Sequence, residues 1–250
     1  MMFSYLDFYD RFSAVKNSGI NAVEFWKWSN KDIDRVEKLL YELDLSLSVM
    51  NIDVKDEALS YDLSRGILNA GRSDEFCSAI KESAPVVKRL KNPALIVLIG
   101  ETIEGMEVSR QEENIYKCLK EGAKVSEDEG IRLVVEPLNA YDRKNYFIPE
   151  SDRLFKILKA VASPNVKMLF DIYHQQKTEG NVTERIEEYA DLIGHFHVAD
   201  NPGRHEPGTG EINYKNVLSK IASLPYDGFV GLEYRATKND DETFGFLSEV

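Results

Sequence analysis

Short apolar runs and longer amphipathic runs alternate along the chain. Most of the short runs are apolar at nearly every position rather than at every second one, which is typical of strands buried on both faces of a parallel sheet. The runs expected to form strands are Ala22–Trp26, Ser46–Ile52, Ala94–Gly100, Arg132–Leu138, Val166–Ile172, Ile193–Ala199 and Phe229–Tyr234.

The longer runs carry helical periodicity and helix-ending signals. Ser109 and Glu112 have capping-box spacing at the start of one of them, and Gly130 ends it. Pro85 is expected to break or kink another, because proline lacks the backbone N–H that a helix interior requires. The predicted helices are Asp7–Lys16, Asp32–Leu43, Asp74–Leu90, Arg110–Glu129, Asp152–Val161, Thr183–Leu192, Tyr214–Ser223 and Glu242–Glu249.

This alternation predicts the fold class α/β, with a parallel sheet covered by helices. Seven strands and eight helices favour a (β/α)₈ TIM barrel over an open sheet. No Gly-x-Gly-x-x-Gly motif follows an early strand, and no phosphate-binding P-loop is present. Because no linker or low-complexity segment interrupts the pattern, we expect residues 1–250 to form a single domain.

The predicted barrel lacks its first strand. The chain opens with the helix Asp7–Lys16, and Met1–Phe3 are at most the end of a preceding strand. A barrel without one strand has two unpaired edges, so we expect a gap between the strands at Ala22 and Phe229. The gap can be left open, filled by another segment, or caused by a recorded start that lies too late. We favour the last of these three explanations. In that case a chain extended by about six to eight upstream residues should have a higher melting temperature than this chain.

Composition and charge narrow the functional class. Apolar residues make up 43% of the chain and charged residues 30%, as in an ordinary globular protein. The formal net charge of −12 argues against a nucleic-acid partner, because neutralising phosphates provides much of that binding. No apolar run is long enough for a bilayer, and the N-terminus does not resemble a signal peptide. We therefore expect a cytoplasmic protein with no membrane partner. The sequence leaves open whether the chain forms a homo-oligomer.

Four predicted strands each carry one metal-ligand type of side chain near the C-terminal end. They are separated by 35, 26 and 36 residues, about one βα unit each, so a barrel would bring them to one rim. Buried carboxylates repel one another unless a cation or a proton lies among them. Carboxylates favour Mg²⁺ or Mn²⁺, and one imidazole shifts the preference toward Mn²⁺ or Zn²⁺. The four residues are Glu136, Asp171, His197 and Glu233.

Weaker candidates surround these four. The strand-and-loop stretch Ile193–Tyr214 contains three of the four histidines of the chain. His174 either orients a substrate or is a hydrogen-bonded loop histidine. Arg204 either binds a substrate carboxylate or is a solvated loop arginine. His195 points to the same face as His197 but deeper, so we interpret it as supporting or packing against His197.

Stretches around these residues resemble the motifs of the hydroxypyruvate isomerase family. They are VVEPLNAYDRKNYF, LFDIYHQQKTEGN, HFHVADNPGRHEPGTGEINY and GFVGLEYR. The HEPGTGEINY string is highly specific to that family, and the resemblance extends from about Gly19 to Arg235. The family belongs to the sugar isomerase and epimerase TIM-barrel superfamily, which has xylose isomerase-like and apurinic-endonuclease relatives.

The resemblance implies a role for each matching residue. Two glutamates would transfer protons as well as bind the metal, and three further residues would contact the substrate. The matches are Glu136, Asp171, His197 and Glu233 as metal ligands, Glu136 and Glu233 as the proton-transfer residues, and His174, Arg204 and Gln176 as substrate contacts.

The implied reaction is the isomerisation of a small hydroxy-carbonyl compound through an enediolate. The favoured substrate is hydroxypyruvate, which would give tartronate semialdehyde, with Arg204 available for its carboxylate. The cofactor would be a divalent metal ion, Mg²⁺ or Mn²⁺ before Zn²⁺ or Co²⁺, without an organic cofactor. A ketose 3-epimerase or another sugar isomerase shares every ligand, and a non-catalytic sugar-binding protein is a remote alternative. An endonuclease is disfavoured, because a multinuclear zinc cluster would need more than the four histidines of this chain and because a net charge of −12 opposes nucleic-acid binding.

Overall fold

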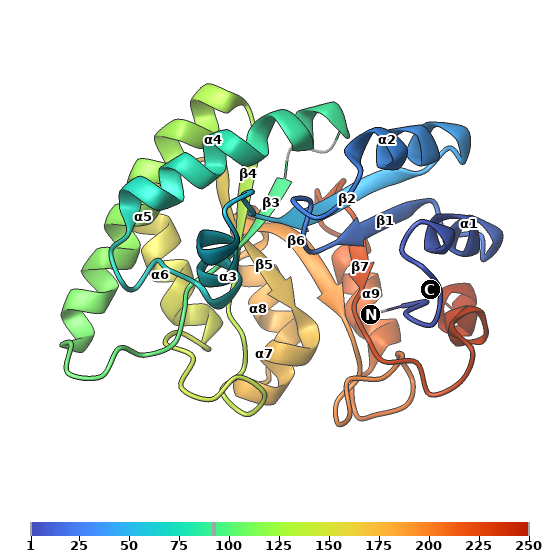
Figure 1. Cartoon of the computed structure of the whole chain (residues 1–250). Coiled ribbons are helices and arrows are strands. Elements are labelled where there is room, and N and C mark those ends of the chain that lie inside the picture. The colour runs from blue at the N-terminus through green and yellow to red at the C-terminus, as the bar shows by residue number, and fades with distance from the viewer. Residues whose placement is uncertain (1, 92–93, 250) are drawn as a thin grey trace.

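The computed structural model describes residues 2–91 and 94–249. Its strands form a single parallel sheet in chain order, so each strand pairs with the one that follows it in sequence. Figure 1 shows the strands at the centre of the molecule and helices around them. The strands are β1 (Ala22–Phe25), β2 (Ser46–Asn51), β3 (Ala94–Leu98), β4 (Arg132–Glu136), β5 (Val166–Asp171), β6 (Ile193–Val198) and β7 (Val230–Leu232).

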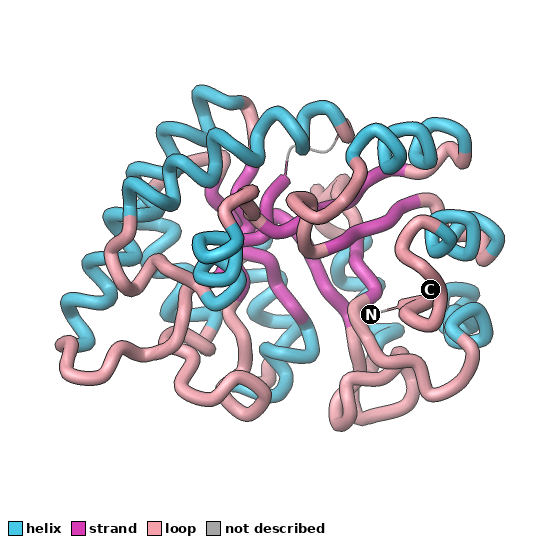
Figure 2. The backbone as a smooth tube through the Cα atoms, in the orientation of Figure 1, coloured by secondary structure: helices cyan, strands magenta, loops and turns pink. Residues whose placement is uncertain are grey.

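Helices cover the outer face of this sheet, and long loops gather at one end of it (Figure 2). Among residues 2–91 and 94–249, no helix is both long and apolar enough to cross a membrane. The α-helices are α1 (Asp10–Asn17), α2 (Ile33–Glu42), α3 (Glu57–Arg65), α4 (Ser73–Arg89), α5 (Val108–Glu129), α6 (Ser151–Val161), α7 (Ile172–Thr178), α8 (Val182–Glu188) and α9 (Tyr214–Ala222), and the 3₁₀-helices are η1 (Ala190–Leu192) and η2 (Asp240–Glu249).

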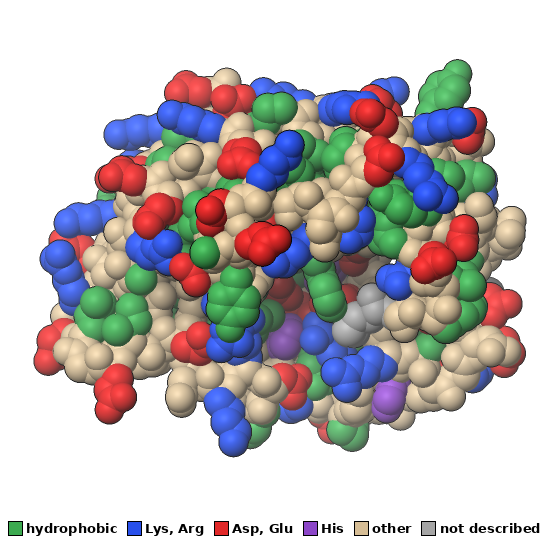
Figure 3. Space-filling model, viewed as in Figure 1, with side chains coloured by type: hydrophobic (Ala, Val, Ile, Leu, Met, Phe, Trp, Pro, Cys, Tyr) green, Lys and Arg blue, Asp and Glu red, His purple; other side chains and the backbone are tan. Residues whose placement is uncertain are grey.

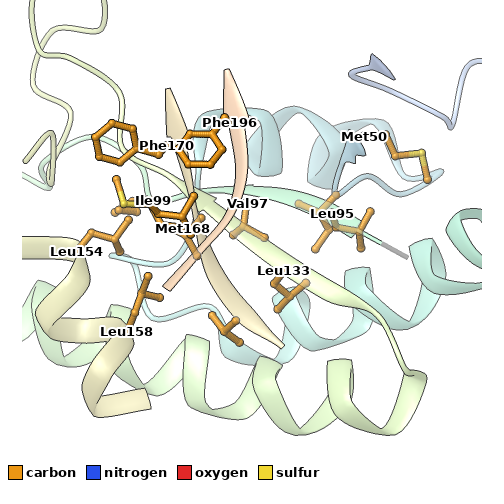
Figure 4. Close-up of a cluster of buried hydrophobic side chains, with 14 of the residues drawn as sticks. Met50, Leu95, Val97, Ile99, Leu133, Leu154, Leu158, Met168, Phe170 and Phe196 are labelled. Atoms are coloured by element: carbon orange, nitrogen blue, oxygen red, sulfur yellow. The ribbon is translucent and has the colours of Figure 1, made fainter. Parts of the chain in front are cut away.

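The strands are apolar on both faces because each face packs against a different core. On β3, Leu95 and Val97 belong to the large cluster between sheet and helices, whereas Ile96 and Leu98 belong to a small cluster with residues of β2, β4 and β5. Figure 4 shows part of the large cluster, with Leu154 and Leu158 of α6 near side chains of the strands. The continuous apolar pattern of the sequence therefore reflects two-sided burial.

The sheet is a nearly closed barrel with one gap, between the edge strands β1 and β7. Ladders join successive strands from β1 to β7, and within the described residues none joins β7 to β1. The predicted gap between these strands is therefore confirmed. The N-terminal segment and η2 lie beside the gap, where the ring centroids of Phe3 and Phe244 are 6.3 Å apart (Figure 1). Met2 and Phe3 form a turn rather than the end of a strand, and Met1 lies outside the described residues.

Several sequence predictions about helices were wrong. Helix α4 continues through Pro85, so the predicted break does not occur, and the proline costs one backbone hydrogen bond. The predicted helix Thr183–Leu192 divides into α8 and η1, and the C-terminal helix is 3₁₀ rather than α. Helices α3 and α7 were not predicted, and α7 follows the last residue of β5 without an intervening loop.

Candidate metal centre

The ends of four neighbouring strands bring the four predicted ligands together. Glu136 ends β4, Asp171 ends β5, His197 is the penultimate residue of β6, and Glu233 directly follows β7. The strand register pairs Asp171 with His197 and His197 with Gly231. One ligand atom from each of the four side chains lies within 4.8 Å of those of the other three. The spacing of about one βα unit therefore produced the clustering that we expected.

The four side chains meet in a largely buried place. Asp171 and His197 are 1% and 3% exposed, and Glu136 is 6% exposed. Nδ1 of His197 lies 3.2 Å from Oε2 of Glu233 and 3.9 Å from Oε1 of Glu136. Asp171 also caps helix α7, because its Oδ1 accepts hydrogen bonds from the backbone N–H groups of Tyr173 and His174. The other oxygen, Oδ2, lies 3.3 Å from Nη2 of Arg204 and 3.6 Å from Nε2 of His174.

Several buried polar atoms at this centre have no hydrogen-bond partner in the described structure. Among the four predicted ligands they are Oε1 of Glu136 and both ring nitrogens of His197. Buried polar atoms are rarely left unpaired, because desolvation without a new bond costs about 1–3 kcal/mol. Three carboxylates and an imidazole with unused lone pairs are a donor set that fits a divalent cation.

The charges at this centre shift one another's protonation. Burial and then the charge of Glu233 raise the pKa of Glu136. Burial acts in the same direction on Glu233, but the close contact and charge of His197, followed by the charge of Arg204, lower the pKa of Glu233. Burial lowers the pKa of His197, but the surrounding glutamates outweigh it and raise that pKa well above the ordinary value. Protons on Glu136 and His197 thus offset part of the negative charge that a bound cation would otherwise neutralise.

Arg204 reaches the same centre from the loop after β6. Its Nη2 donates to Oε2 of Glu233 at 2.6 Å and to Oδ2 of Asp171 at 3.3 Å. The guanidinium carbon lies 5.3 Å from the ring centroid of Tyr173. Arg204 is therefore a pocket residue rather than a solvated loop arginine, and its contact with substrate stays a prediction.

His174 lies beside Asp171, with a defined tautomer. Its Nδ1 accepts a hydrogen bond from the backbone N–H of Asn139 at 3.0 Å, so the proton of the neutral ring is on Nε2. Burial lowers the pKa of His174, which keeps the ring neutral. Nε2 lies 3.6 Å from Oδ2 of Asp171 and has no hydrogen-bond partner among the described residues. It can therefore donate to an oxygen of a substrate.

Gln176 is not brought to this centre. Its Nε2 donates to Oε1 of Glu211 at 3.4 Å in an exposed position, and Gln176 does not line the cavity described below. The preceding residue on α7, Gln175, is buried and donates to the carbonyl oxygen of Pro137. The substrate contact predicted for Gln176 stays a prediction.

A cavity of about 1020 Å³ opens over the centre and extends along the gap between β1 and β7. Figure 3 shows a hollow in this face, with acidic, basic and histidine side chains inside it. Trp26 lines the cavity while remaining 57% exposed, whereas Trp28 is buried and donates to Ser83. The lining includes Glu136, His174, His197, Arg204 and Glu233.

Sequence reasoning missed a polar group at the mouth of this cavity. Asp142 accepts hydrogen bonds of 2.6 Å from Oη of Tyr173 and from Nζ of Lys177, and it also lines the cavity. Burial opposes ionisation, but the bonds from Lys177 and Tyr173 lower the pKa of Asp142. The only sequence signal was its position six residues after Glu136, in the same motif.

Asp200 organises the loop that carries Arg204. Its carboxylate is fully buried and accepts hydrogen bonds from the backbone N–H groups of Asn201, Gly208 and Ile212. Gly210 permits this arrangement, since a Cβ there would be 2.2 Å from the carbonyl oxygen of Asn201 and 2.6 Å from Oδ1 of Asp200. The HEPGTGEINY string therefore encodes a loop wrapped around one carboxylate.

A family model described as "Xylose isomerase-like TIM barrel" matches residues 12–249. Hydroxypyruvate isomerase from Escherichia coli (strain K12) is 33% identical, over 94% of this chain and 90% of the relative. 2-Oxo-tetronate isomerase from Cupriavidus necator is 29% identical, over 99% of this chain and 94% of the relative.

Solved structures share the same architecture. The crystal structure of "AP endonuclease, family 2" from Brucella melitensis has a TM-score of 0.90 and 29% identity, over 99% of this chain and 95% of that one. The 3-keto-D-glucoside 4-epimerase from E. coli has a TM-score of 0.80 over 99% of this chain and 97% of that one. At 17% identity the epimerase shows a shared fold alone.

Proposed function

The chain belongs to the xylose isomerase-like TIM barrel family and is an isomerase, and from that premise we propose that it isomerises hydroxypyruvate to tartronate semialdehyde with a divalent metal ion. The convergence of Glu136, Asp171, His197 and Glu233 within 4.8 Å is the observation that carries the metal requirement. The substrate follows from the relatives and from Arg204. Both relatives named above are isomerases of 2-oxo acids by their names.

The four residues would hold Mg²⁺ or Mn²⁺, with Zn²⁺ or Co²⁺ as alternatives. When bound, the ion supplies Lewis-acid polarisation of the substrate carbonyl. Their unpaired buried atoms, Oε1 of Glu136 and Nδ1 of His197, support this assignment.

Glu136 and Glu233 are the proposed proton carriers. They lie at the ends of β4 and β7, which are not neighbours in the sheet, so they approach the centre from different sides. One removes a proton from the hydroxyl-bearing carbon, and the other returns a proton to the former carbonyl carbon. The substrate hydroxyl loses its proton and the former carbonyl oxygen gains one, so the product is an isomer of the substrate. The two glutamates return to their starting protonation states by exchange with solvent. Nε2 of His174 is placed to donate to one of those oxygens.

The proposal is tested by offering hydroxypyruvate, tetruloses and hexuloses with Mg²⁺, Mn²⁺ or Co²⁺ in deuterated water. The metal is removed with a chelator before the products are identified by NMR. We expect tartronate semialdehyde with deuterium on the carbon that received the proton. A stereoinverted ketose, without conversion of hydroxypyruvate, would instead identify a 3-epimerase. No turnover of any compound despite bound metal would identify a sugar-binding protein.

A nuclease is disfavoured, although the Brucella melitensis protein carries an endonuclease name. The net charge of −12 opposes approach to a phosphate backbone. Within residues 2–91 and 94–249, the residues that could hold metal form two groups that share His197, and neither contains more than two histidines. A multinuclear zinc cluster would need more histidine ligands than these two groups contain.

Removal of the Arg204 guanidinium should weaken the binding of carboxylate substrates selectively. The Arg204→Ala variant is expected to bind hydroxypyruvate roughly tenfold or more weakly, because a charge-assisted bidentate contact is worth about 1.5–3 kcal/mol. The affinity for neutral ketoses should fall by a smaller factor. Arg143→Ala is the matched control, since Arg143 lines the cavity but bonds Glu101 and the carbonyl of Arg65. Equal losses on both substrate classes would exclude Arg204 from carboxylate recognition.

Metal affinity should rise with pH between about 6 and 8. The pKa values of Glu136 and His197 are raised, so both groups hold protons that a metal must displace. Each displaced proton should tighten Mn²⁺ binding by up to about tenfold per pH unit. The metal-free protein should lose stability over the same range, since folding favours the protonated forms that are lost as pH rises. Titration calorimetry at several pH values measures the affinity, and a pH-independent constant would contradict the expectation.

A further inference from the structure

A fifth charged group lies on the other side of His197 from the proposed metal. Glu24 is the third residue of β1, and its Oε1 lies 3.3 Å from Nε2 of His197. Its Oε2 lies 3.3 Å from Nε2 of His195 and accepts a hydrogen bond of 3.0 Å from Oγ of Ser48. One carboxylate thus contacts both buried histidines of β6.

The two ring nitrogens of His197 face different groups. Nδ1 faces Glu136 and Glu233, and Nε2 faces Glu24. A neutral imidazole that gives the Nδ1 lone pair to a cation has its proton on Nε2, where a carboxylate can accept it. The separation of 3.3 Å is slightly longer than a normal N–H···O bond, and Nε2 has no formed hydrogen bond in the described structure. A small rotation of the His197 ring would bring Nε2 within normal hydrogen-bonding distance of Oε1 of Glu24.

Strand β7 leaves room for this contact. A Cβ on Gly231 would be 2.6 Å from Oε1 of Glu24 and 2.7 Å from Cδ2 of His197. Any side chain there would separate the carboxylate from the imidazole. Gly231 is paired with His197 in the ladder, so it faces the ring directly. Glu24 therefore reaches across the gap between β1 and β7 to the side of His197.

We propose that Glu24 is a positioning residue, which holds His197 with Nδ1 turned toward the metal and Nε2–H turned toward the carboxylate. This role rests on the proposed metal centre. It gives β1 a function in catalysis even though no ladder joins it to β7 in the described residues. It also explains His195, which contacts the far oxygen of Glu24 and so helps to fix that carboxylate.

A second cation held by Glu24, His195 and His197 is the rival interpretation, because their ligand atoms also lie within 4.8 Å of one another. The two interpretations differ in chemistry. A protonated Nε2 cannot bind a metal, so a positioning role predicts one ion per chain. A second site predicts two ions, with His197 between them.

The test is a Mn²⁺ titration of the metal-stripped full chain, read by calorimetry and by electron paramagnetic resonance. We expect one ion per chain in the unmodified protein and about 10- to 100-fold weaker binding in Glu24→Gln. In the Zn²⁺-loaded protein, labelled with ¹⁵N-histidine, the His197 proton should be on Nε2 and shifted downfield, and Glu24→Gln should remove that shift. Asp53→Asn is the matched control, a buried carboxylate that bonds Ser29 and Ser60 instead. Its Mn²⁺ affinity should be unchanged.

Each outcome has a distinct meaning. Absence of Mn²⁺ binding in the unmodified protein would refute the metal centre itself. Unchanged affinity and an unchanged Nε2–H signal in Glu24→Gln would overturn the positioning role alone, as would two ions per chain. If Glu24→Gln does not fold, Ser48→Ala replaces it, because the hydroxyl holds Oε2 of Glu24. That variant should bind Mn²⁺ at least about threefold more weakly, and an unchanged constant would again overturn the role.

Discussion

Glu136→Gln and Glu233→Gln should each reduce the incorporation of solvent deuterium into the product, tartronate semialdehyde, by roughly 10²- to 10⁴-fold, the usual contribution of a positioned acid or base. Glutamine has the shape of glutamate but cannot carry the transferred proton. The fold should survive, because each side chain keeps an oxygen and its packing. Proton NMR of hydroxypyruvate incubated in deuterated water measures the exchange.

Loss of metal must be separated from loss of proton transfer, since both glutamates are also proposed ligands. Mn²⁺ binding is therefore measured on each variant, and exchange is compared at saturating metal. Glu211→Gln is the control, an exposed glutamate of the neighbouring loop that bonds Asn201. The Glu211→Gln variant should incorporate solvent deuterium at the rate of the unmodified protein. Near-normal exchange in either Glu136→Gln or Glu233→Gln would remove that residue from the proton transfer.

Asp200→Ala should lower the free energy of unfolding by about 3–5 kcal/mol. The substitution leaves three backbone N–H groups without their acceptor, and each such loss costs about 1–3 kcal/mol depending on how well water can replace it. The loop between β6 and α9 should loosen, and Arg204 would no longer be held against Glu233. Urea unfolding monitored by circular dichroism measures the stability, and the binding of hydroxypyruvate measures the effect on the loop.

Asp200→Asn provides the matched comparison. Its single amide oxygen can still accept from Asn201 and Ile212, which both bond Oδ1, but the acceptor for Gly208 is lost. The asparagine variant should therefore be destabilised by roughly a third to a half of the alanine effect. A loss below about 1 kcal/mol for Asp200→Ala would show that this carboxylate does not organise the loop.

The strands were predictable from sequence because their burial is two-sided. Continuous apolar runs such as ALIVL of β3 mark such strands, and the sequence correctly located all the strands that the described residues form. Strand ends were less well predicted: β7 spans Val230–Leu232, shorter than the predicted Phe229–Tyr234. Hydropathy does not indicate where the ladder bonds stop.

The clustering of the candidate metal ligands was predictable for a related reason. A carboxylate or imidazole inside an apolar run is costly unless it has a partner, so Glu136 and Asp171 stood out in VVEPLN and MLFDIYH. Glu24 has the same property in AVEF but was not singled out. Its partners His195 and His197 lie far along the chain, and their proximity arises from the curvature of the sheet.

Features set by local geometry were harder to predict. Neighbouring helical residues point about 100° apart, so Gln175 is buried while Gln176 is only partly buried, and motif matching alone does not tell which one faces the site. Helix α7 begins at Ile172, directly after Asp171, so its first turn continues the apolar run of β5 without a break in pattern. The capping role of Asp171 was therefore hidden by its role as a candidate ligand.

The most direct test of the metal centre is anomalous diffraction from a crystal of the protein grown with Mn²⁺. We predict one anomalous peak per chain, within coordination distance of Glu136, Asp171, His197 and Glu233, with Nδ1 as the contact atom of His197. A peak elsewhere, or these four side chains pointing away from one another in a crystal saturated with Mn²⁺, would contradict the proposed metal-dependent isomerase.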